Sequence, residues 1–315
     1  MRVLVSGGAG FIGSNLVDAL VARGDEVTVL DDLSSGKASN LDAATAGGAR
    51  LIQGDVGNPE KVSEAFAIAE PEQVFHLAAQ IDVRVSVSDP VFDLQVNVGG
   101  TINLLEASAR AGTKRFLFAS TGGAIYGEGD GRNLPLDEGA DRRPDAPYGQ
   151  SKLAAEGYLD LFSRLHGLET VALRLGNVYG PRQDPHGEAG VVAIFCGALL
   201  SGLTPKVFGD GLQTRDYVYV GDVVSAFLAA SGSPATGAFN VGTGREASVL
   251  DVGEAIASAY DVSFDPEMAA PRAGEVQRIA ISPAKAGAEL GWEPRLDLSE
   301  GLRLTANWAR EDRGG

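Results

Sequence analysis

Short apolar runs alternate with amphipathic stretches through the first half of the chain. Val3, Leu4 and Val5 stand in a row, which is typical of a parallel strand covered on both faces. This alternation predicts βαβ units, beginning with a strand over Arg2–Ser6 and a helix over Phe11–Arg23. Further strands are predicted over Val27–Leu30, Leu51–Gln53, Gln73–Leu77, Arg115–Ala119 and Thr170–Leu175.

Two longer stretches carry enough spaced apolar residues for long helices. They span Val91–Ala109 and Tyr148–Leu165. Gly99 and Gly100 weaken the middle of the first helix, because glycine is a poor helix former.

Beyond Asn177 glycine and proline become frequent and the predicted elements are shorter. We therefore predict an α/β protein with a doubly wound parallel sheet in residues 1–176. Residues 177–315 are expected to form mainly a smaller α/β domain that binds the substrate. This boundary is soft, because a late strand such as Ala238–Val241 can join the first sheet.

Composition narrows the class of protein. With 315 residues, 44% of them hydrophobic, the chain can bury a sizeable core. A formal net charge of −16 argues against nonspecific binding to nucleic acid or to an anionic membrane. The single cysteine, Cys196, excludes an internal disulfide, and the apolar run around it is shorter than the roughly 20 residues that cross a bilayer. No signal peptide precedes the first strand, so we expect a cytoplasmic protein.

A glycine triplet joins the first predicted strand to the first helix. Its spacing is Gly7-x-x-Gly10-Phe11-Ile12-Gly13. Small residues let the chain turn sharply and bring the unpaired N–H groups of a helix N-terminus against a pyrophosphate. A triplet alone is weak, but its position between a buried strand and a helix predicts the Rossmann dinucleotide site.

Acidic residues follow the next two strands. Asp31 and Asp32 end the second strand, where a carboxylate accepts hydrogen bonds from the adenosine ribose and repels a 2′-phosphate. The predicted cofactor is therefore NAD rather than NADP, although one of the two acids can instead cap the following turn. Asp55 and Val56, after the third strand, are placed to meet the adenine.

Tyr148 and Lys152 open the second long helix, four residues apart and therefore on one face. A tyrosine phenol titrates near 10, but a nearby ammonium and a positively charged nicotinamide favour the phenolate. Tyr148 is then a candidate base for a sugar hydroxyl. Tyr-x-x-x-Lys also occurs by chance, as an anchored ring beside a solvated lysine. Its position after a dinucleotide fingerprint makes it the strongest catalytic candidate.

These motifs resemble the extended short-chain dehydrogenase/reductase family and, within it, the UDP-glucose (UDP-galactose) 4-epimerases. The resemblance runs in order along nearly the whole chain, which is far more specific than any single motif. In the first half it rests on Gly7–Ser14, Leu30–Leu33, Phe75–Gln80, Asn97–Thr101, Ser120–Gly127 and Tyr148–Lys152. In the second half it rests on Arg174–Gln183, Phe208–Gly211, Arg215–Val218, Asn240–Gly244, Pro271–Arg272 and Gly274–Glu275.

The resemblance implies roles for individual residues. Tyr148 would be the base, and Lys152 would bind the nicotinamide ribose and tune Tyr148. Other residues would line the cofactor: Leu77, Ala78, Ala79 and Asn97. The UDP-sugar diphosphate would be held by Asn177, Arg215 and Arg272, the arginines as bidentate partners of phosphate oxygens. The resemblance also implies a homodimer paired through the two long helices.

One departure concerns the hydroxyl expected beside the base. The family usually carries Ser or Thr four residues before the tyrosine that matches Tyr126, and here that position is Gly122. Ser120 and Thr121 are the available hydroxyls, and we predict Thr121 as the partner of the sugar hydroxyl.

The predicted reaction is 4-epimerisation of a UDP-hexose through a transient 4-keto sugar. Related 4,6-dehydratases and UDP-glucuronate decarboxylases carry an acid where this chain has Ala124, so both become weaker alternatives. UDP-N-acetylhexosamine or UDP-glucuronate epimerisation and a catalytically silent NAD sensor remain open. No His/Asp/Glu cluster has metal-ligand spacing, so no metal is expected.

Overall fold

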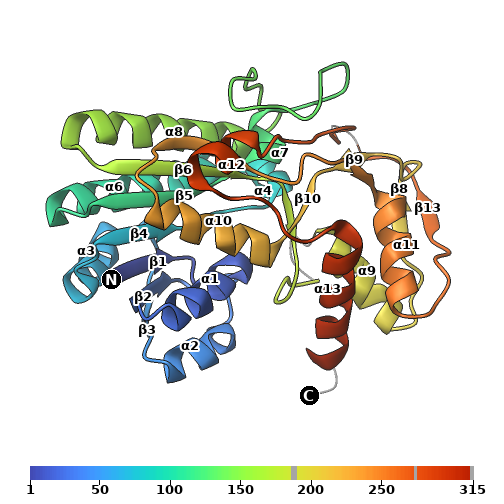
Figure 1. Ribbon diagram of the computed structural model, residues 1–315, viewed down its shortest axis with the longest axis horizontal. Helices are drawn as coiled ribbons and strands as arrows, with labels where there is room; N and C mark the ends of the chain where they lie inside the picture. Colours follow the sequence, from blue (N-terminus) through green and yellow to red (C-terminus); the bar gives the residue numbers. More distant parts are fainter. Residues whose placement is uncertain (186–189, 273–274, 313–315) are drawn as a thin grey trace.

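A parallel sheet of seven strands forms the centre of the molecule (Figure 1). The computed structural model describes residues 1–185, 190–272 and 275–312, so Gly274 of the motif above lies outside the described residues. The strand order is β11-β6-β5-β4-β1-β2-β3, and all neighbours are parallel. The strands span β1 Arg2–Ser6, β2 Glu26–Asp31, β3 Arg50–Gln53, β4 Gln73–His76, β5 Arg115–Thr121, β6 Glu169–Leu175 and β11 Gly237–Val241. The predicted doubly wound parallel sheet is confirmed.

Helices cover both faces of this sheet, which explains its continuous apolar strands. One face is covered by α3 Pro59–Ala69, α6 Gly100–Ala111 and α8 Pro147–His166, which lie side by side in Figure 1. The other face is covered by α1 Phe11–Ala22, α10 Val220–Gly232 and α12 Ala284–Leu290, with η1 Ala38–Leu41 and α2 Asp42–Ala46 beside α1. The strand order reverses between β1 and β4, which is where ligands bind in this class of fold.

A second group of elements stands beyond the carboxyl ends of the strands, on the right of Figure 1. Tyr179, Phe195, Val252 and Leu302 are buried in its own apolar core. The group comprises β7 Asn177–Tyr179, α9 Val191–Leu200, β8 Lys206–Phe208, β9 Thr214–Arg215, β10 Tyr217–Tyr219, β12 Ala247–Ser248, α11 Val249–Ala259, β13 Glu267–Ala269 and α13 Leu298–Asp312. The chain returns from this group to the sheet in β11, which pairs with β6.

The predicted helix over Val91–Ala109 is divided into three parts. After the short helices α4 Val83–Ser88 and α5 Pro90–Leu94, a π-helical turn, η2 Gln95–Gly99, leads into α6. The wider π turn ends at Gly99, and Gly100 begins α6, so the irregular turn lies at the weak middle that the two glycines predicted. Another short helix, α7 Gly122–Ile125, directly follows β5.

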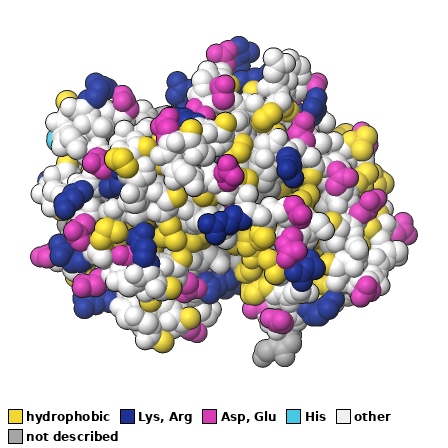
Figure 2. Space-filling view, viewed as in Figure 1, with side chains coloured by type: hydrophobic (Ala, Val, Ile, Leu, Met, Phe, Trp, Pro, Cys, Tyr) yellow, Lys and Arg dark blue, Asp and Glu magenta, His cyan; other side chains and the backbone are white. Residues whose placement is uncertain are grey.

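Acidic and basic side chains alternate over the face shown in Figure 2, and Lys and Arg stand among Asp and Glu. Among the described residues, no helix combines the length and apolar character that crossing a membrane requires.

Candidate functional site

The glycine turn between β1 and α1 is packed so tightly that side chains are excluded. Gly7 has φ +72°, and its N–H donates to the Leu30 carbonyl of β2 at 2.9 Å. A Cβ at Gly13 would stand 2.0 Å from the Gly7 carbonyl oxygen. Gly10 precedes α1, so the first N–H groups of that helix meet no capping side chain in the part of the chain that is described. Phe11 and Ile12 begin the helix half-exposed, and the turn has the form of a pyrophosphate cradle.

Asp31 and Asp32 both cap turns. Asp31 is buried and accepts hydrogen bonds from the N–H groups of Ala9 and Leu33, at 2.8 and 2.9 Å. It therefore ties the glycine turn to the end of β2. Burial raises the pKa of its carboxyl, and these hydrogen bonds partly oppose the rise. Asp32 is exposed and accepts from the N–H of Ser34.

The remaining predicted cofactor residues lie along the same edge of the sheet. Asp55 is exposed and accepts from the Gly57 N–H at 2.7 Å, whereas Val56 is buried. The N–H groups of Leu77 and Ala78 both donate to the Ser6 carbonyl, so this segment continues alongside β1 toward the glycine turn. Three residues of the segment are half-buried: Leu77, Ala78 and Ala79.

Asn97 lies in the π-helical turn and is buried. Its side-chain oxygen accepts from the N–H of Gln80, and its amide donates to the Gln80 carbonyl, each at 2.9 Å. Asn97 thus holds the backbone of Gln80, the residue after the predicted cofactor-lining segment, as a neighbouring strand would.

Tyr148 and Lys152 occupy the first turns of α8, which begins with Pro147 at its first position. Lys152 is buried, and its Nζ donates to the Ala119 carbonyl at 2.9 Å. Burial lowers the pKa of Lys152 to about 8, against the fields of Asp93 and Glu156. Burial and Asp93 together raise the pKa of the Tyr148 phenol. A phenolate here therefore requires additional positive charge beside Tyr148.

The two candidate hydroxyls at the end of β5 point to different partners. Ser120 is buried and donates to Glu156 at 2.7 Å, and Glu156 in turn pairs with Arg174 of β6 at 2.6 Å. Thr121 is half-buried and accepts from the Ala124 N–H at 3.2 Å, which leaves its own hydrogen available for donation. A Cβ at Gly122 would stand 2.5 Å from Ile281, so this position faces the core. The geometry favours Thr121 over Ser120.

The predicted substrate residues lie in the second group of elements. Asn177 begins β7, and a Cβ at Gly123 would stand 3.6 Å from its Oδ1, which places it beside α7. Arg215 ends β9, is largely buried and lies 3.7 Å from Glu275. Arg272 is exposed and lies 4.0 Å above the ring of Phe208 at the end of β8.

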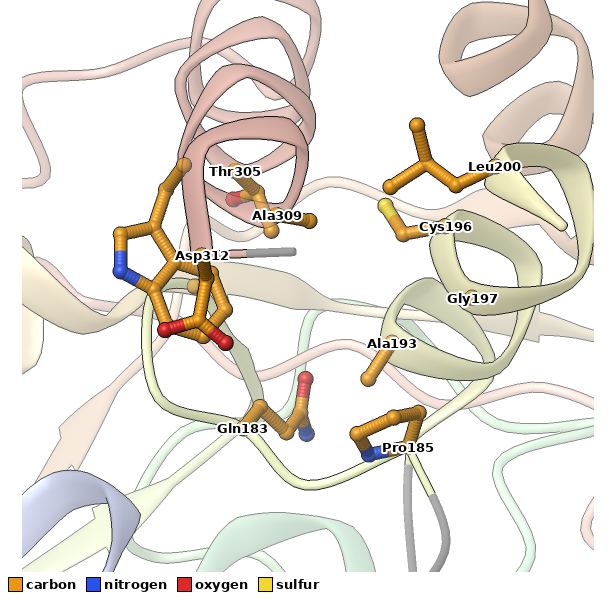
Figure 3. Close-up of a pocket in the computed structure, with 11 residues that line it drawn as sticks. Gln183, Pro185, Ala193, Cys196, Gly197, Leu200, Thr305, Ala309 and Asp312 are labelled. Carbon is orange, nitrogen blue, oxygen red and sulfur yellow. The ribbon is translucent and has the colours of Figure 1, made fainter. Parts of the chain in front are cut away.

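A pocket between α9 and α13 lies outside this constellation (Figure 3). Residues of both helices line it, including Cys196 and Thr305, with Gln183 below. Burial raises the pKa of the Cys196 thiol to about 11, so the thiol is protonated at neutral pH. Cys196 is a packing residue, and none of the predicted site residues lines this pocket.

Taken together, the sheet, the glycine turn and the tyrosine–lysine pair define an enzyme of the dinucleotide-binding α/β class. The sequence model of the NAD dependent epimerase/dehydratase family matches residues 3–242, and the chain belongs to that family. The resemblance to the extended short-chain dehydrogenases/reductases is thereby confirmed, and NAD is the cofactor that the family description names.

Individual relatives match over almost their full length. A UDP-glucose 4-epimerase of Mycolicibacterium smegmatis is 47% identical over 313 residues, 98% of this chain and 99% of the relative. A UDP-glucose 4-epimerase of Thermotoga maritima, solved with UDP-glucose, has a TM-score of 0.95 and 44% identity over 99% of this chain and 100% of that one. The Thermus thermophilus UDP-glucose 4-epimerase, solved with NAD, has a TM-score of 0.92 and 47% identity over 98% and 99%.

Three residues at this site carried no role in the sequence interpretation: Asp93, Glu156 and Phe208. Phe208 stands in a motif of the resemblance, but only the fold brings Arg272 over its ring. Asp93 and Glu156 are acids inside helical patterns, where the usual expectation is a solvated face. Their contacts cross between elements, so no local signal marks them.

Proposed function

We propose that the protein catalyses NAD-dependent 4-epimerisation of a UDP-hexose, interconverting UDP-glucose and UDP-galactose through a transient 4-keto sugar. The observation that carries the proposal is the position of Tyr148 and Lys152. Both open α8 beside the end of β5, where Thr121 presents a free hydroxyl hydrogen, at the carboxyl edge that holds the glycine cradle. The near full-length similarity to UDP-glucose 4-epimerases supports the same reaction.

The side chains divide the work as follows. Tyr148 accepts the proton of the sugar 4′-hydroxyl and later returns it, and Thr121 orients that hydroxyl by a hydrogen bond. Lys152 holds the nicotinamide ribose and stabilises the phenolate of Tyr148. Bound NAD supplies a reversible acceptor for the hydrogen at C4′ and a positive ring that offsets the raised pKa of Tyr148.

In this proposal the substrate-binding residues hold the nucleotide and do not fix which face of the sugar ring meets the cofactor. We assign Asn177, Arg215 and Arg272 to the diphosphate and Phe208 to stacking on the base. Because the nucleotide is bound and the hexose is not, the flat 4-keto sugar can rotate and present its other face. In this assignment residues 1–176 mainly bind the cofactor and residues 177–315 mainly bind the nucleotide sugar.

The glycine turn and the two acids at the end of β2, Asp31 and Asp32, support NAD rather than NADP. Asp31 is committed to the turn, and Asp32 keeps one side-chain oxygen unused by the bonds to Ser34. The carboxylates at this edge disfavour a 2′-phosphate by charge repulsion. The protein should release NAD and not NADP when it is denatured.

The main competing reactions need an acid that this chain does not place in α7. A dehydratase or decarboxylase step would require a proton donor near Ala124, and the neighbouring residues are Gly122, Gly123 and Ile125. N-acetylhexosamine and uronate substrates differ at C2 and C6, and a silent NAD sensor would show no turnover. A panel of UDP-sugars separates these alternatives.

The decisive experiment follows deuterium at C4′ of UDP-galactose. Epimerisation returns the same hydrogen, so the label should remain at C4′ of UDP-glucose, without added NAD and without accumulating NADH. Stoichiometric NADH or loss of the label to water would overturn the epimerase proposal.

We also infer that the protein acts as a homodimer in the cytoplasm. Exposed apolar side chains on α4, α5 and α8 support the dimer: Val83, Val87, Val91, Leu94, Tyr158 and Leu165. These helices contact one another, which supports a shared surface. Cell fractionation tests the location.

A further inference from the structure

Asp93 is a buried acid at the meeting point of three elements of the site. It belongs to α5, directly before the π-helical turn, and its side chain is fully buried. Its Oδ2 accepts from the Ser151 hydroxyl of α8 at 2.6 Å. Its Oδ1 accepts from the side-chain amides of Gln80 and Asn97, each at 3.0 Å.

These three donors connect Asp93 to both halves of the proposed chemistry. Ser151 lies between Tyr148 and Lys152, so its hydrogen bond fixes the turn of α8 that carries them. Gln80 directly follows the cofactor-lining segment Leu77–Ala79, and Asn97 holds its backbone. One carboxylate therefore links the catalytic helix to the cofactor edge of the sheet.

A buried carboxylate is retained in a core only when hydrogen bonds or an opposite charge compensate its desolvation. Asp93 has three hydrogen bonds, and its field acts on the nearby ammonium of Lys152. We propose that Asp93 is a positioning residue of the acid–base site, whose carboxylate fixes the catalytic turn of α8 against the cofactor edge and places a negative charge within that turn's surroundings. This inference rests on the proposed roles of Tyr148 and Lys152.

The other charged groups described around Asp93 and Lys152 are either bonded to other residues or exposed. Glu156 of α8 also acts on Lys152, but it is bound to Arg174 and Ser120. His76 of β4 is hydrogen-bonded to the hydroxyls of Ser6 and Thr101, and burial and Lys152 hold its pKa well below the ordinary value. On α4 and α6 the charged side chains are exposed: Arg84, Glu106 and Arg110.

The charge of Asp93 determines in which direction the pKa values of Lys152 and Tyr148 should change when it is removed. The negative charge of Asp93 raises the pKa of Lys152 and also raises the pKa of Tyr148. Removing the charge should lower both values. The acid limb of the activity profile reports formation of the phenolate, and the alkaline limb reports loss of the ammonium. Both limbs should therefore move to lower pH.

The test compares Asp93→Asn with Ser151→Ala. The amide in Asp93→Asn can still accept from Gln80 and Asn97 and can donate to the Ser151 oxygen, so shape is kept and charge is lost. We expect kcat/KM profiles shifted to lower pH by about one unit. Ser151→Ala keeps the charge and removes one hydrogen bond, so kcat should fall about tenfold with both limbs in place.

A second readout does not depend on turnover. The Cε resonance of Lys152 in isotope-labelled protein, assigned with Lys152→Met, should titrate near 8 in the native chain and about one unit lower in Asp93→Asn. Asp160→Asn is the matched control, because it removes an exposed acid from α8, the helix that carries Lys152. Its profile and its Lys152 titration should match those of the native chain.

Unchanged limbs and an unchanged Lys152 titration in Asp93→Asn would overturn the proposal, whatever the activity of the variant. A native kcat in Ser151→Ala would overturn the positioning role. If Asp93→Asn does not fold, the kcat of Ser151→Ala alone tests that role. A native protein that turns over no UDP-sugar would instead defeat the proposed function, and the titration of Lys152 would still report on Asp93.

Discussion

Tyr148 shows how one side chain can be assigned from both its position and its surroundings. It is half-buried at the start of α8, and burial and Asp93 raise the pKa of its phenol. The tyrosine is therefore protonated in the free protein, and in the proposed mechanism positive charge from the bound cofactor is needed to form the base. If Tyr148 is the base as proposed, this coupling would restrict proton removal to the protein with bound cofactor.

Tyr148→Phe should keep the fold and the bound NAD while turnover falls about 10²- to 10⁴-fold, because only the proton acceptor is lost. Turnover, NAD released on denaturation and thermal unfolding are measured together. Tyr158→Phe is the control, since Tyr158 lies on the same helix with its side chain exposed. Near-native activity in Tyr148→Phe would mean that the base lies elsewhere.

Ser120 and Thr121 are adjacent in sequence but differ in what their hydroxyls do. Thr121→Ala should lower kcat about 10²-fold with little change in thermal stability, because its hydroxyl is available to the sugar. Ser120→Ala should instead lower the free energy of unfolding by about 1 kcal/mol, because Glu156 loses a buried donor. The opposite pattern in kinetics and unfolding would reverse the assignment of the two hydroxyls.

At the scale of elements, the turn between β1 and α1 is the most tightly constrained part of the cofactor site. Gly13→Ala forces a Cβ to within 2.0 Å of the Gly7 carbonyl oxygen, and backbone atoms cannot simply move aside. We expect loss of bound NAD and destabilisation by about 1–3 kcal/mol. Thermal unfolding and cofactor content are the measurements.

Gly287→Ala provides the control for that variant. Gly287 lies in α12, and the nearest atom to an added Cβ is 3.7 Å away, which is ordinary contact. Alanine should therefore stabilise the helix by about 0.4–1 kcal/mol and leave NAD bound. A Gly13→Ala protein that retains NAD would show that the cradle lies elsewhere.

The order of elements could be predicted from sequence because each strand and helix carries its own periodic pattern. The long helix over Val91–Ala109 was predicted with a weak middle, and the structure places the π-helical turn there. The exact division was not predictable, because Asp93 and Asn97 stabilise it through Gln80 and Ser151 in other elements. Contacts between distant segments leave no local period to detect.

The candidate site shows the same division between local and distant signals. The glycine triplet and the tyrosine–lysine spacing are local, so both were visible in the sequence. Thr121 was also predicted over Ser120, but the physical reason was not visible, because Ser120 is bound to Glu156 in α8, which lies 36 residues further along the chain. Asp31 likewise ends its strand as expected, but its bond to Ala9 appears only in the fold.

At the scale of the whole molecule, two separate apolar cores stabilise the fold. The sheet and its flanking helices bury residues such as Phe75 and Phe118 on opposite faces. The second group buries its own cluster around Phe195 and Val252. The proposed substrate residues Arg215 and Asn177 lie on short strands of the second group, so each core can position its own side of the proposed site.

The apolar side formed by α4, α5 and α8 belongs to this scale, since its residues stay exposed in a single chain. Val87 and Leu165 are 63% and 64% exposed. Apolar side chains gathered on one side of a molecule usually mark an interface, and a two-fold dimer covers the same surface on both copies. Light scattering of the purified protein should therefore give twice 32.6 kDa.

Val87→Glu combined with Leu165→Glu should yield monomers, because two identical surfaces would then bury four unpaired carboxylates. Leu203→Glu is the matched control, since Leu203 is also 64% exposed but follows α9 in the second group of elements. That variant should remain a dimer. A native protein of single-chain mass, or a double variant that still pairs, would place the interface elsewhere. Because α8 also carries Tyr148 and Lys152, the monomer should bind NAD more weakly, and added NAD should shift the double variant back toward dimer.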